Sequence, residues 1–282
     1  MRRRQSSTRG ANGPSDAGFA HPPARKRFGQ NFLADPSAVR RILAALAVAP
    51  DETVLEIGPG RGALTDALLS AVPAIWAVEI DRNLVADLTS RYPADRLRLI
   101  EGDVLDLDFA PLAAEGKLAI AGNLPYNISK PVAMKLVAER RLVSRAVLMF
   151  QREVAMRLTA LPGTKAYGPL TILCGRAFRI ERLFDLAPGC FRPAPSVMST
   201  VTRWVRLPDD ALPDAEEAPL RAVLSAAFAH RRQTLHKNLR ERLPGGDAMV
   251  RELLAAAGLD GSLRAEAIPP EGFVALAHVW PV

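Results

Sequence analysis

Residues 53–62 read TVLEIGPGRG, and this stretch sets the architecture expected for the whole chain. A short apolar run ends at Ile57, a turn with three glycines follows, and residues 63–72 have a helical pattern. The order predicts a strand, a glycine turn and a helix. Because glycine lacks a Cβ and tolerates positive φ, the backbone at Gly58 and Gly60 can approach a ligand closely. The sequence therefore predicts a Rossmann-like α/β domain that binds a ligand at this turn.

Three more apolar runs predict strands whose carboxyl ends share one edge of the sheet with this turn. They are residues 75–80, 97–100 and 118–121. Polar side chains stand at or just beyond their ends, namely Glu79, Asp103 and Asn123. We expect Glu79 to accept both hydroxyls of a ribose and Asp103 to bond an adenine amine. A dinucleotide such as NAD is the alternative ligand, but the turn reads Gly-x-Gly-x-Gly, which makes a pyrophosphate cradle the less natural reading.

Residues 123–126, Asn-Leu-Pro-Tyr, suit the methylation of an exocyclic amine. The N6 amine of adenine is a poor nucleophile because its lone pair is delocalised into the ring. The side-chain oxygen of Asn123 and the backbone carbonyl of Leu124 can each accept one N–H bond, which favours a pyramidal nitrogen. Pro125 holds the turn, and Tyr126 offers a flat face for an extruded base. For so short a motif, a polar turn that closes a strand is the alternative.

Five motifs in order resemble the S-adenosylmethionine-dependent adenine-N6 dimethyltransferases of small-subunit (16S) ribosomal RNA, the kasugamycin-sensitivity type. They are GQNFL at 29–33, EIGPG at 56–60, NLPYNIS at 123–129, KAYG at 165–168 and FRPAPSV at 191–197, and the resemblance covers about residues 25–280. It implies the class I methyltransferase fold and S-adenosylmethionine as cofactor. The cofactor contacts that it implies, in addition to the glycine turn at Gly58 and Gly60, are Asn31, Leu33, Glu79, Asp103 and Asn123. It also implies catalysis through Asn123 and Leu124, with Tyr126 and Phe191 on either side of the target base.

The reaction implied by this resemblance is dimethylation of N6 on two adjacent adenosines near the 3′ end of small-subunit rRNA, late in subunit assembly. Two alternatives stay open: a large-subunit rRNA methyltransferase of the macrolide-resistance type, and a non-catalytic assembly factor on the same fold. Gly29, Leu124 and Asn127 favour the small-subunit branch. Arg61 departs from the family pattern, in which a smaller or apolar residue is common, and we expect its side chain to be solvated.

Positive charge is concentrated at the N-terminus. The chain has a formal net charge of +7, and residues 1–27 hold seven Lys or Arg and one Asp, which leaves the remainder nearly neutral. RNA binding by the folded part therefore has to rest on local patches. The best candidate lies on the helical pattern within residues 221–242, where we expect contacts to RNA phosphates. Its members are Arg231, Arg232, Lys237 and Arg240. An ordinary charged helix face is the alternative.

Composition divides the chain into four segments. Residues 1–24, rich in Arg, Ser, Gly and Pro, predict a disordered basic tail that touches RNA, with an organelle transit peptide as the alternative. Residues 25–207 predict the methyltransferase domain. Residues 208–219, with three prolines and an acidic run, predict a linker. Residues 220–282 predict a small helical RNA-binding domain, with an RNA-binding cleft between the two domains.

Length and composition agree with a folded enzyme. A chain of 282 residues with 49% hydrophobic content can bury one large core and a smaller one. No apolar run approaches the roughly 18 to 20 residues that span a bilayer, so we expect a cytoplasmic protein without a membrane segment. Cys174 and Cys190 lack metal spacing and the four histidines are scattered, which predicts reduced thiols and no metal site. We expect a monomer whose partner is the small-subunit precursor with its rRNA.

Overall fold

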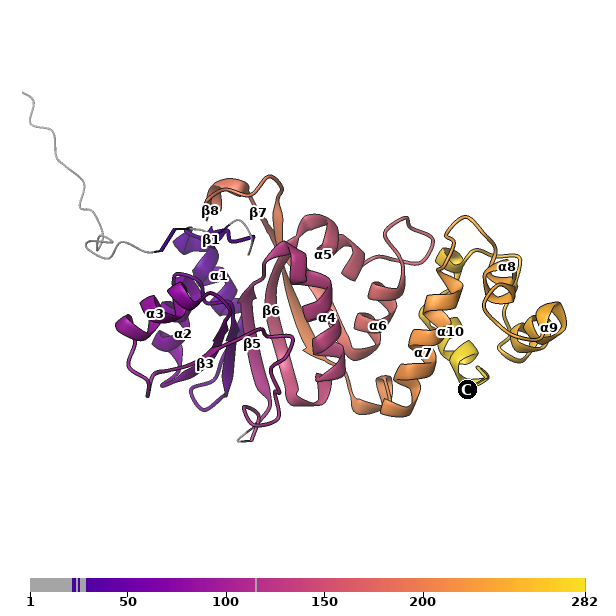
Figure 1. Cartoon of the computed structure of the whole chain (residues 1–282), viewed down its shortest axis with the longest axis horizontal. Coiled ribbons are helices and arrows are strands. Elements are labelled where there is room, and N and C mark those ends of the chain that lie inside the picture. Colours follow the sequence, from indigo (N-terminus) through magenta and orange to yellow (C-terminus); the bar gives the residue numbers. More distant parts are fainter. Residues whose placement is uncertain (1–21, 24, 26–28, 115, 282) are drawn as a thin grey trace, which may run out of the picture.

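The computed structural model describes residues 22, 23, 25, 29–114 and 116–281, and the predicted tail at 1–24 lies almost entirely outside them. A seven-stranded sheet in the order β4-β3-β2-β5-β6-β9-β7 forms the centre of the molecule (Figure 1). Its strands are β2 (Val54–Ile57), β3 (Ile75–Glu79), β4 (Leu97–Glu101), β5 (Leu118–Asn123), β6 (Val143–Gln151), β7 (Phe178–Leu186) and β9 (Ser199–Arg206). Strand β9 is antiparallel to both of its neighbours, and the other neighbouring strands of this sheet pair in parallel. The strands predicted from the sequence are confirmed.

The central strands are apolar on both sides because helices cover both faces of the sheet. Along β5, Leu118 and Ile120 belong to one hydrophobic cluster, whereas Ala119 and Ala121 belong to the other. Figure 1 shows α1 to α3 beside β3 and α4 to α6 beyond β5. Their bounds are α1 (Pro36–Leu46), α2 (Ala63–Ala71), α3 (Arg82–Arg91), α4 (Ser129–Ala138), α5 (Arg152–Leu158) and α6 (Pro169–Ala177). The first helix is capped by Asp35, whose carboxylate accepts a hydrogen bond from the Ser37 amide at 2.8 Å.

The structure adds a two-stranded ribbon that the sequence did not predict. Strand β1 (Phe32–Leu33) pairs antiparallel with β8 (Phe191–Arg192), so that residues far apart in the chain become neighbours. Short 3-10 turns fill several connections. They are η2 (Tyr126–Ile128), η3 (Arg140–Leu142), η4 (Pro188–Cys190), η5 (Asp209–Ala211) and η6 (Ala265–Ala267).

A helical unit follows the sheet and lies at the far end of the molecule from α3 (Figure 1). It consists of α7 (Asp214–Ala227), α8 (Leu235–Arg240), α9 (Gly246–Ala256) and α10 (Pro270–His278). One hydrophobic cluster runs without a break from Phe178 in the sheet to Leu224 and Phe273 in these helices. The unit is therefore joined to the α/β domain by a shared apolar core. None of the described helices is long and apolar enough to cross a membrane.

The predicted linker at 208–219 is wrong in its second half, because α7 already begins at Asp214. The acidic run that suggested a linker supplies the first turn of this helix, where Asp214, Glu216 and Glu217 favour the positive end of the helix dipole. Pro219 lies inside the helix and does not end it.

The single helical pattern expected within residues 221–242 is also wrong. Helix α7 ends at Ala227, and α8 begins only at Leu235. The buried Asn238 explains the break, because its Nδ2 donates to the carbonyl oxygens of Ala227 at 2.8 Å and His230 at 3.1 Å. Arg231 and Arg232 consequently lie in the turn between the two helices.

Candidate active site

A pocket opens at the carboxyl edge of the sheet, where β2, β3, β4 and β5 end. Nine of the residues predicted to contact cofactor or target base line it: Asn31, Leu33, Gly58, Gly60, Glu79, Asp103, Asn123, Leu124 and Tyr126. The fold therefore gathers side chains that are up to 95 positions apart, from residue 31 to residue 126, around one cavity. Phe191 does not line the cavity.

The glycine turn leaves no room for a side chain at Gly60. Gly58 and Gly60 have φ values of 66° and 58°, in the left-handed region that favours glycine. A Cβ on Gly60 would lie 2.9 Å from Cδ1 of Phe32. The Arg61 side chain, expected to be solvated, is only partly exposed: its guanidinium lies over the Phe32 ring, 4.5 Å from the centroid, and donates to the carbonyl of Pro22 at 3.0 Å.

Two carboxylates at strand ends are held by backbone amides. Glu79 is buried and accepts hydrogen bonds from the amides of Gly60 at 3.2 Å and Asp81 at 2.9 Å. Burial raises the pKa of Glu79, although these hydrogen bonds oppose the shift. Asp103 accepts from the amide of Leu105 at 2.9 Å. Both carboxylates keep further lone pairs with which to accept hydrogen bonds from a ligand.

Glu56 is a residue of this pocket to which the sequence analysis gave no role. Its side chain is only 1% exposed, and burial raises its pKa to about 8. The Thr65 hydroxyl donates to its Oε2 at 2.6 Å. The sequence did carry a signal for Glu56, because it is a lone acid inside an apolar strand that is buried on both faces. Burying a carboxyl group there costs free energy unless the group is hydrogen-bonded.

Asn123 is oriented by the backbone of Asn31, 92 positions earlier in the chain. Its Nδ2 donates to the Asn31 carbonyl oxygen at 2.7 Å. Because a carbonyl oxygen can only accept, the amide nitrogen has to face this contact, which turns Oδ1, the acceptor of the side chain, away from it. The predicted acceptor for an adenine amine is therefore held in a fixed orientation.

The residues predicted to flank the base differ in their exposure. Tyr126 is half-buried at the pocket, and its hydroxyl lies 3.1 Å from the hydroxyl of Ser199 in β9, which anchors the ring. Phe191 is 1% exposed and packs in the same hydrophobic cluster as Leu33, its ribbon partner. Phe191 thus has a packing function in this conformation, and its place beside the base stays a prediction.

The predicted RNA-binding side chains divide into two groups. The Arg231 guanidinium donates to the carbonyls of Lys165 at 2.7 Å and Tyr167 at 3.3 Å, and Arg240 lies 3.7 Å from the Asp247 carboxylate. Arg231 therefore ties the loop before α6 to the helical unit. All four residues are exposed, as phosphate contacts require, but among the described residues the side chains of Arg232 and Lys237 have no ion pair. These two are the stronger candidates for RNA contacts.

The sheet order, with its single reversed strand next to the last position, and the glycine turn and acids at its edge define a class I S-adenosylmethionine-dependent methyltransferase. The family model of ribosomal RNA adenine dimethylases matches residues 22–278. The chain belongs to this family, which confirms the resemblance seen in its motifs.

Individual relatives agree with this assignment. The chain is 46% identical over 255 residues to ribosomal RNA small subunit methyltransferase A of Aromatoleum aromaticum, covering 90% of this chain and 93% of the relative. It is 44% identical to the protein of the same name in Syntrophotalea carbinolica, covering 92% and 97%. Among solved structures, a dimethyladenosine transferase from Plasmodium falciparum has a TM-score of 0.75 at 24% identity, covering 87% and 95%, and supports the fold. The 23S rRNA methyltransferase ErmE has a TM-score of 0.66 at 25% identity, covering 88% and 98%.

Proposed function

We propose that Asn123, Leu124 and Tyr126 carry out the reaction of this family at the edge of the pocket. The reaction itself follows from family membership: the chain is an S-adenosylmethionine-dependent enzyme that dimethylates adenine N6 in small-subunit rRNA. The large-subunit alternative is not favoured, because relatives named for the small subunit reach 46% identity and ErmE only 25%.

The residues at the glycine turn and the strand ends fit the cofactor. A backbone cradle that excludes a Cβ at Gly60 suits a ligand in close contact with the turn. Two carboxylates suit the hydroxyls of a ribose and the amine of an adenine. We assign the cofactor contacts to Asn31, Leu33, Gly58, Gly60, Glu79, Asp103 and Asn123. When bound, S-adenosylmethionine supplies an electrophilic methyl group on a sulfonium.

The oriented amide of Asn123 is the observation that carries this proposal. Its Oδ1 accepts one N–H of the target amine, and the carbonyl of Leu124 accepts the other, so the nitrogen becomes pyramidal and its lone pair is localised. The buried side chain of Leu124 fixes that part of the backbone. Tyr126 stacks on the extruded adenine. The chain thus holds the nucleophile in place for in-line attack on the methyl carbon. The N6 nitrogen becomes acidic only once methylated and then loses its proton to water, so no strong base is required.

Finer points of the reaction are proposals that rest on the resemblance. The substrate is the precursor of the small subunit, and the targets are two adjacent adenosines near the 3′ end of its rRNA. Phosphates of this rRNA contact Arg232 and Lys237, with Arg240 and Arg231 at the border of the patch. The enzyme acts as a cytoplasmic monomer. Phe191 forms the second side of the base pocket.

Methyl transfer to ribosomal subunits tests the function. Purified protein is incubated with labelled S-adenosylmethionine and either small or large subunits that lack the modification, and the methylated nucleotides are mapped. We expect two dimethylated adenosines in the small-subunit rRNA, and much slower methylation with Asn123→Ala as the matched control. Label confined to large-subunit rRNA would overturn the assignment of the substrate.

A further inference from the structure

Residues 29–33, called the strap here, all line the pocket and are anchored at both ends. At one end, Leu33 pairs with Phe191, and the amide of Ala34 donates to the Cys190 carbonyl at 2.8 Å. At the other end, Gln30 Nε2 donates to Oδ2 of Asp81 at 3.0 Å. The strap therefore links β8 to the N-terminus of α3.

Asp81, which accepts the hydrogen bond from Gln30, is itself held in place by burial and by further contacts. Its side chain is only 1% exposed, and its Oδ1 caps α3 by accepting from the amide of Asn83 at 3.1 Å. The guanidinium of Arg25 lies 3.1 Å from the same oxygen. Gln30 completes the cluster, because its Oε1 accepts from the amide of Arg25 at 2.7 Å. The Gln30 amide is thus bonded on both sides, which fixes the strap at this point.

The atom that orients Asn123 belongs to the strap. The Asn31 carbonyl, which accepts from Nδ2 of Asn123, directly follows Gln30 in the chain. Gly29, just before Gln30, has a φ of 61° and lies against the 123–127 motif: a Cβ there would lie 3.5 Å from Oδ1 of Asn127. A displacement of Gln30 therefore moves the carbonyl on which the orientation of the Asn123 amide depends.

We propose that Gln30 and Asp81 are positioning residues for methyl transfer. Their hydrogen bond holds the strap so that the Asn31 carbonyl keeps the Asn123 amide turned with its oxygen toward the target amine. This inference rests on the proposed function of Asn123. It adds that the Asn123 amide is held in place by a contact outside its own loop, the hydrogen bond between Gln30 of the strap and Asp81 at the N-terminus of α3.

An exchange of donor and acceptor tests the contact. Gln30→Glu sets a carboxylate against the Asp81 carboxylate. Asp81→Asn keeps an oxygen that can cap α3 but turns an NH2 group toward that of Gln30. In the double variant the introduced carboxylate accepts from the introduced amide, which restores the contact. We expect each single variant to lower kcat about 10-fold at saturating cofactor and saturating small subunits, and the double variant to recover to within about threefold.

Glu101→Gln is the matched control. It removes one negative charge at the same edge of the sheet, from an exposed pair with Arg82, and Glu101 makes no contact with the strap. Its kcat should stay at the wild-type value. Because Gln30 is only half-buried, Gln30→Glu should fold even if Asp81→Asn lowers the melting temperature.

Three results would overturn the inference: single variants with wild-type kcat, single variants that raise only the KM for the cofactor, or a double variant that does not recover. The same assay on Asn123→Ala separates the two proposals. If Asn123→Ala is slow but the Gln30 and Asp81 variants are not, only the positioning contact is refuted. If Asn123→Ala turns over normally, the proposed function fails first.

Discussion

Glu56 is a carboxyl group in the centre of the sheet, and its titration is coupled to folding. Burial raises its pKa from an ordinary value of 4.5 to about 8. Between these pH values the folded protein binds a proton that the unfolded chain does not. The stability that this group contributes is therefore fully present below about pH 4.5 and is lost as the pH rises toward about 8.

Glu56→Gln should therefore stabilise the protein at alkaline pH. The substitution removes the titration, so the melting temperature should exceed that of the wild type at pH 9 by several degrees, at roughly 2–4 °C per kcal/mol. At pH 5 the difference should be small. Thermal melts of both proteins at the two pH values measure it, with Glu101→Gln as an exposed control. An equal difference at both pH values would show that Glu56 is not the titrating group.

At the residue level, the sequence predicted side chains whose position follows from connectivity. Glu79, Asp103 and Asn123 meet because parallel strands bring their carboxyl ends to one edge. The contact between Asn123 and the Asn31 carbonyl could not be predicted, because it joins a side chain to a backbone atom 92 positions away. No pattern of residue types encodes such a pair.

At the scale of elements, the glycine turn and the strap fit each other. Two separate features of position 60 favour glycine: its positive φ, and the Phe32 ring, which lies too close for a Cβ. Gly258 also has a positive φ, of 66°, but nothing lies within 4 Å of a Cβ placed there. Substituting each glycine by alanine therefore separates the effect of backbone strain from the effect of a steric clash with the strap.

Gly60→Ala should weaken cofactor binding far more than Gly258→Ala. The Cβ would lie 2.9 Å from Cδ1 of Phe32 and displace the strap from the turn, so we expect the Kd for S-adenosylmethionine to rise at least about 10-fold. Gly258→Ala should cost about 1 kcal/mol of stability and leave the Kd unchanged. Calorimetry and thermal melts measure both. Equal Kd values for the two variants would contradict the close fit of turn and strap.

Most of the long elements were predictable, because each has a clear period or a cap. The ribbon of β1 and β8 was not, since two residues per strand carry no periodicity. The break between α7 and α8 was missed because it depends on hydrogen bonds of the buried Asn238. The acids of α7 resembled a linker because first-turn acids and solvated loops have the same composition.

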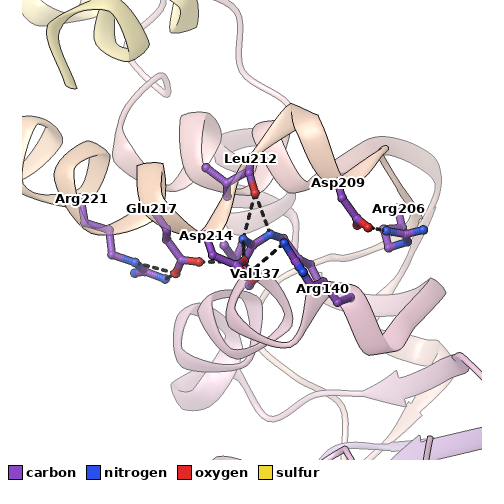
Figure 2. Close-up of polar contacts among 9 residues, drawn as sticks. Val137, Arg140, Arg206, Asp209, Leu212, Asp214, Glu217 and Arg221 are labelled. Atoms are coloured by element: carbon purple, nitrogen blue, oxygen red, sulfur yellow. Dashed lines mark hydrogen bonds and ion pairs between the residues drawn. The ribbon is translucent and has the colours of Figure 1, made fainter. Parts of the chain in front are cut away.

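At the scale of the whole molecule, Arg140 joins the α/β domain to the helical unit (Figure 2). Its side chain is 7% exposed and donates to the carbonyls of Leu212 at 2.9 Å and Val137 at 3.0 Å, and to the carboxylate of Glu217 at 2.7 Å. The contact therefore bridges α4, the connection at η5 and the start of α7. Its neighbour Arg141 is 54% exposed and lies 3.0 Å from the Asp214 carboxylate.

Arg140→Ala should destabilise the protein by about 2–3 kcal/mol, because it removes the donor from the buried Leu212 carbonyl and from Oε2 of Glu217, whereas Oε1 of Glu217 keeps its hydrogen bonds from Arg221. Arg141→Ala should cost less than about 1 kcal/mol, as is usual for surface pairs. Denaturant unfolding of the two variants measures the difference. Similar losses for both would mean that the joint does not depend on the buried guanidinium.

The helical unit should contribute to rRNA affinity through its exposed cations. Arg232→Ala and Lys237→Ala should each reduce the slope of log affinity against log salt concentration by about 0.7–0.9, the value expected for one lost phosphate contact. Arg231→Ala should act mainly on stability, because its guanidinium is engaged by the carbonyls of Lys165 and Tyr167. Salt titrations of binding to small subunits measure the slopes. Unchanged slopes for Arg232→Ala and Lys237→Ala would place the rRNA elsewhere.

The rate of a single turnover in Asn123→Ala tests the central claim most directly. The enzyme is saturated with S-adenosylmethionine and is in excess over small subunits. Removal of the oriented acceptor should slow methyl transfer about 100-fold or more, the usual effect of losing one hydrogen-bonding group that stabilises a transition state. The Kd for the cofactor should stay within about threefold of the wild-type value. A single-turnover rate close to that of the wild type would contradict the account.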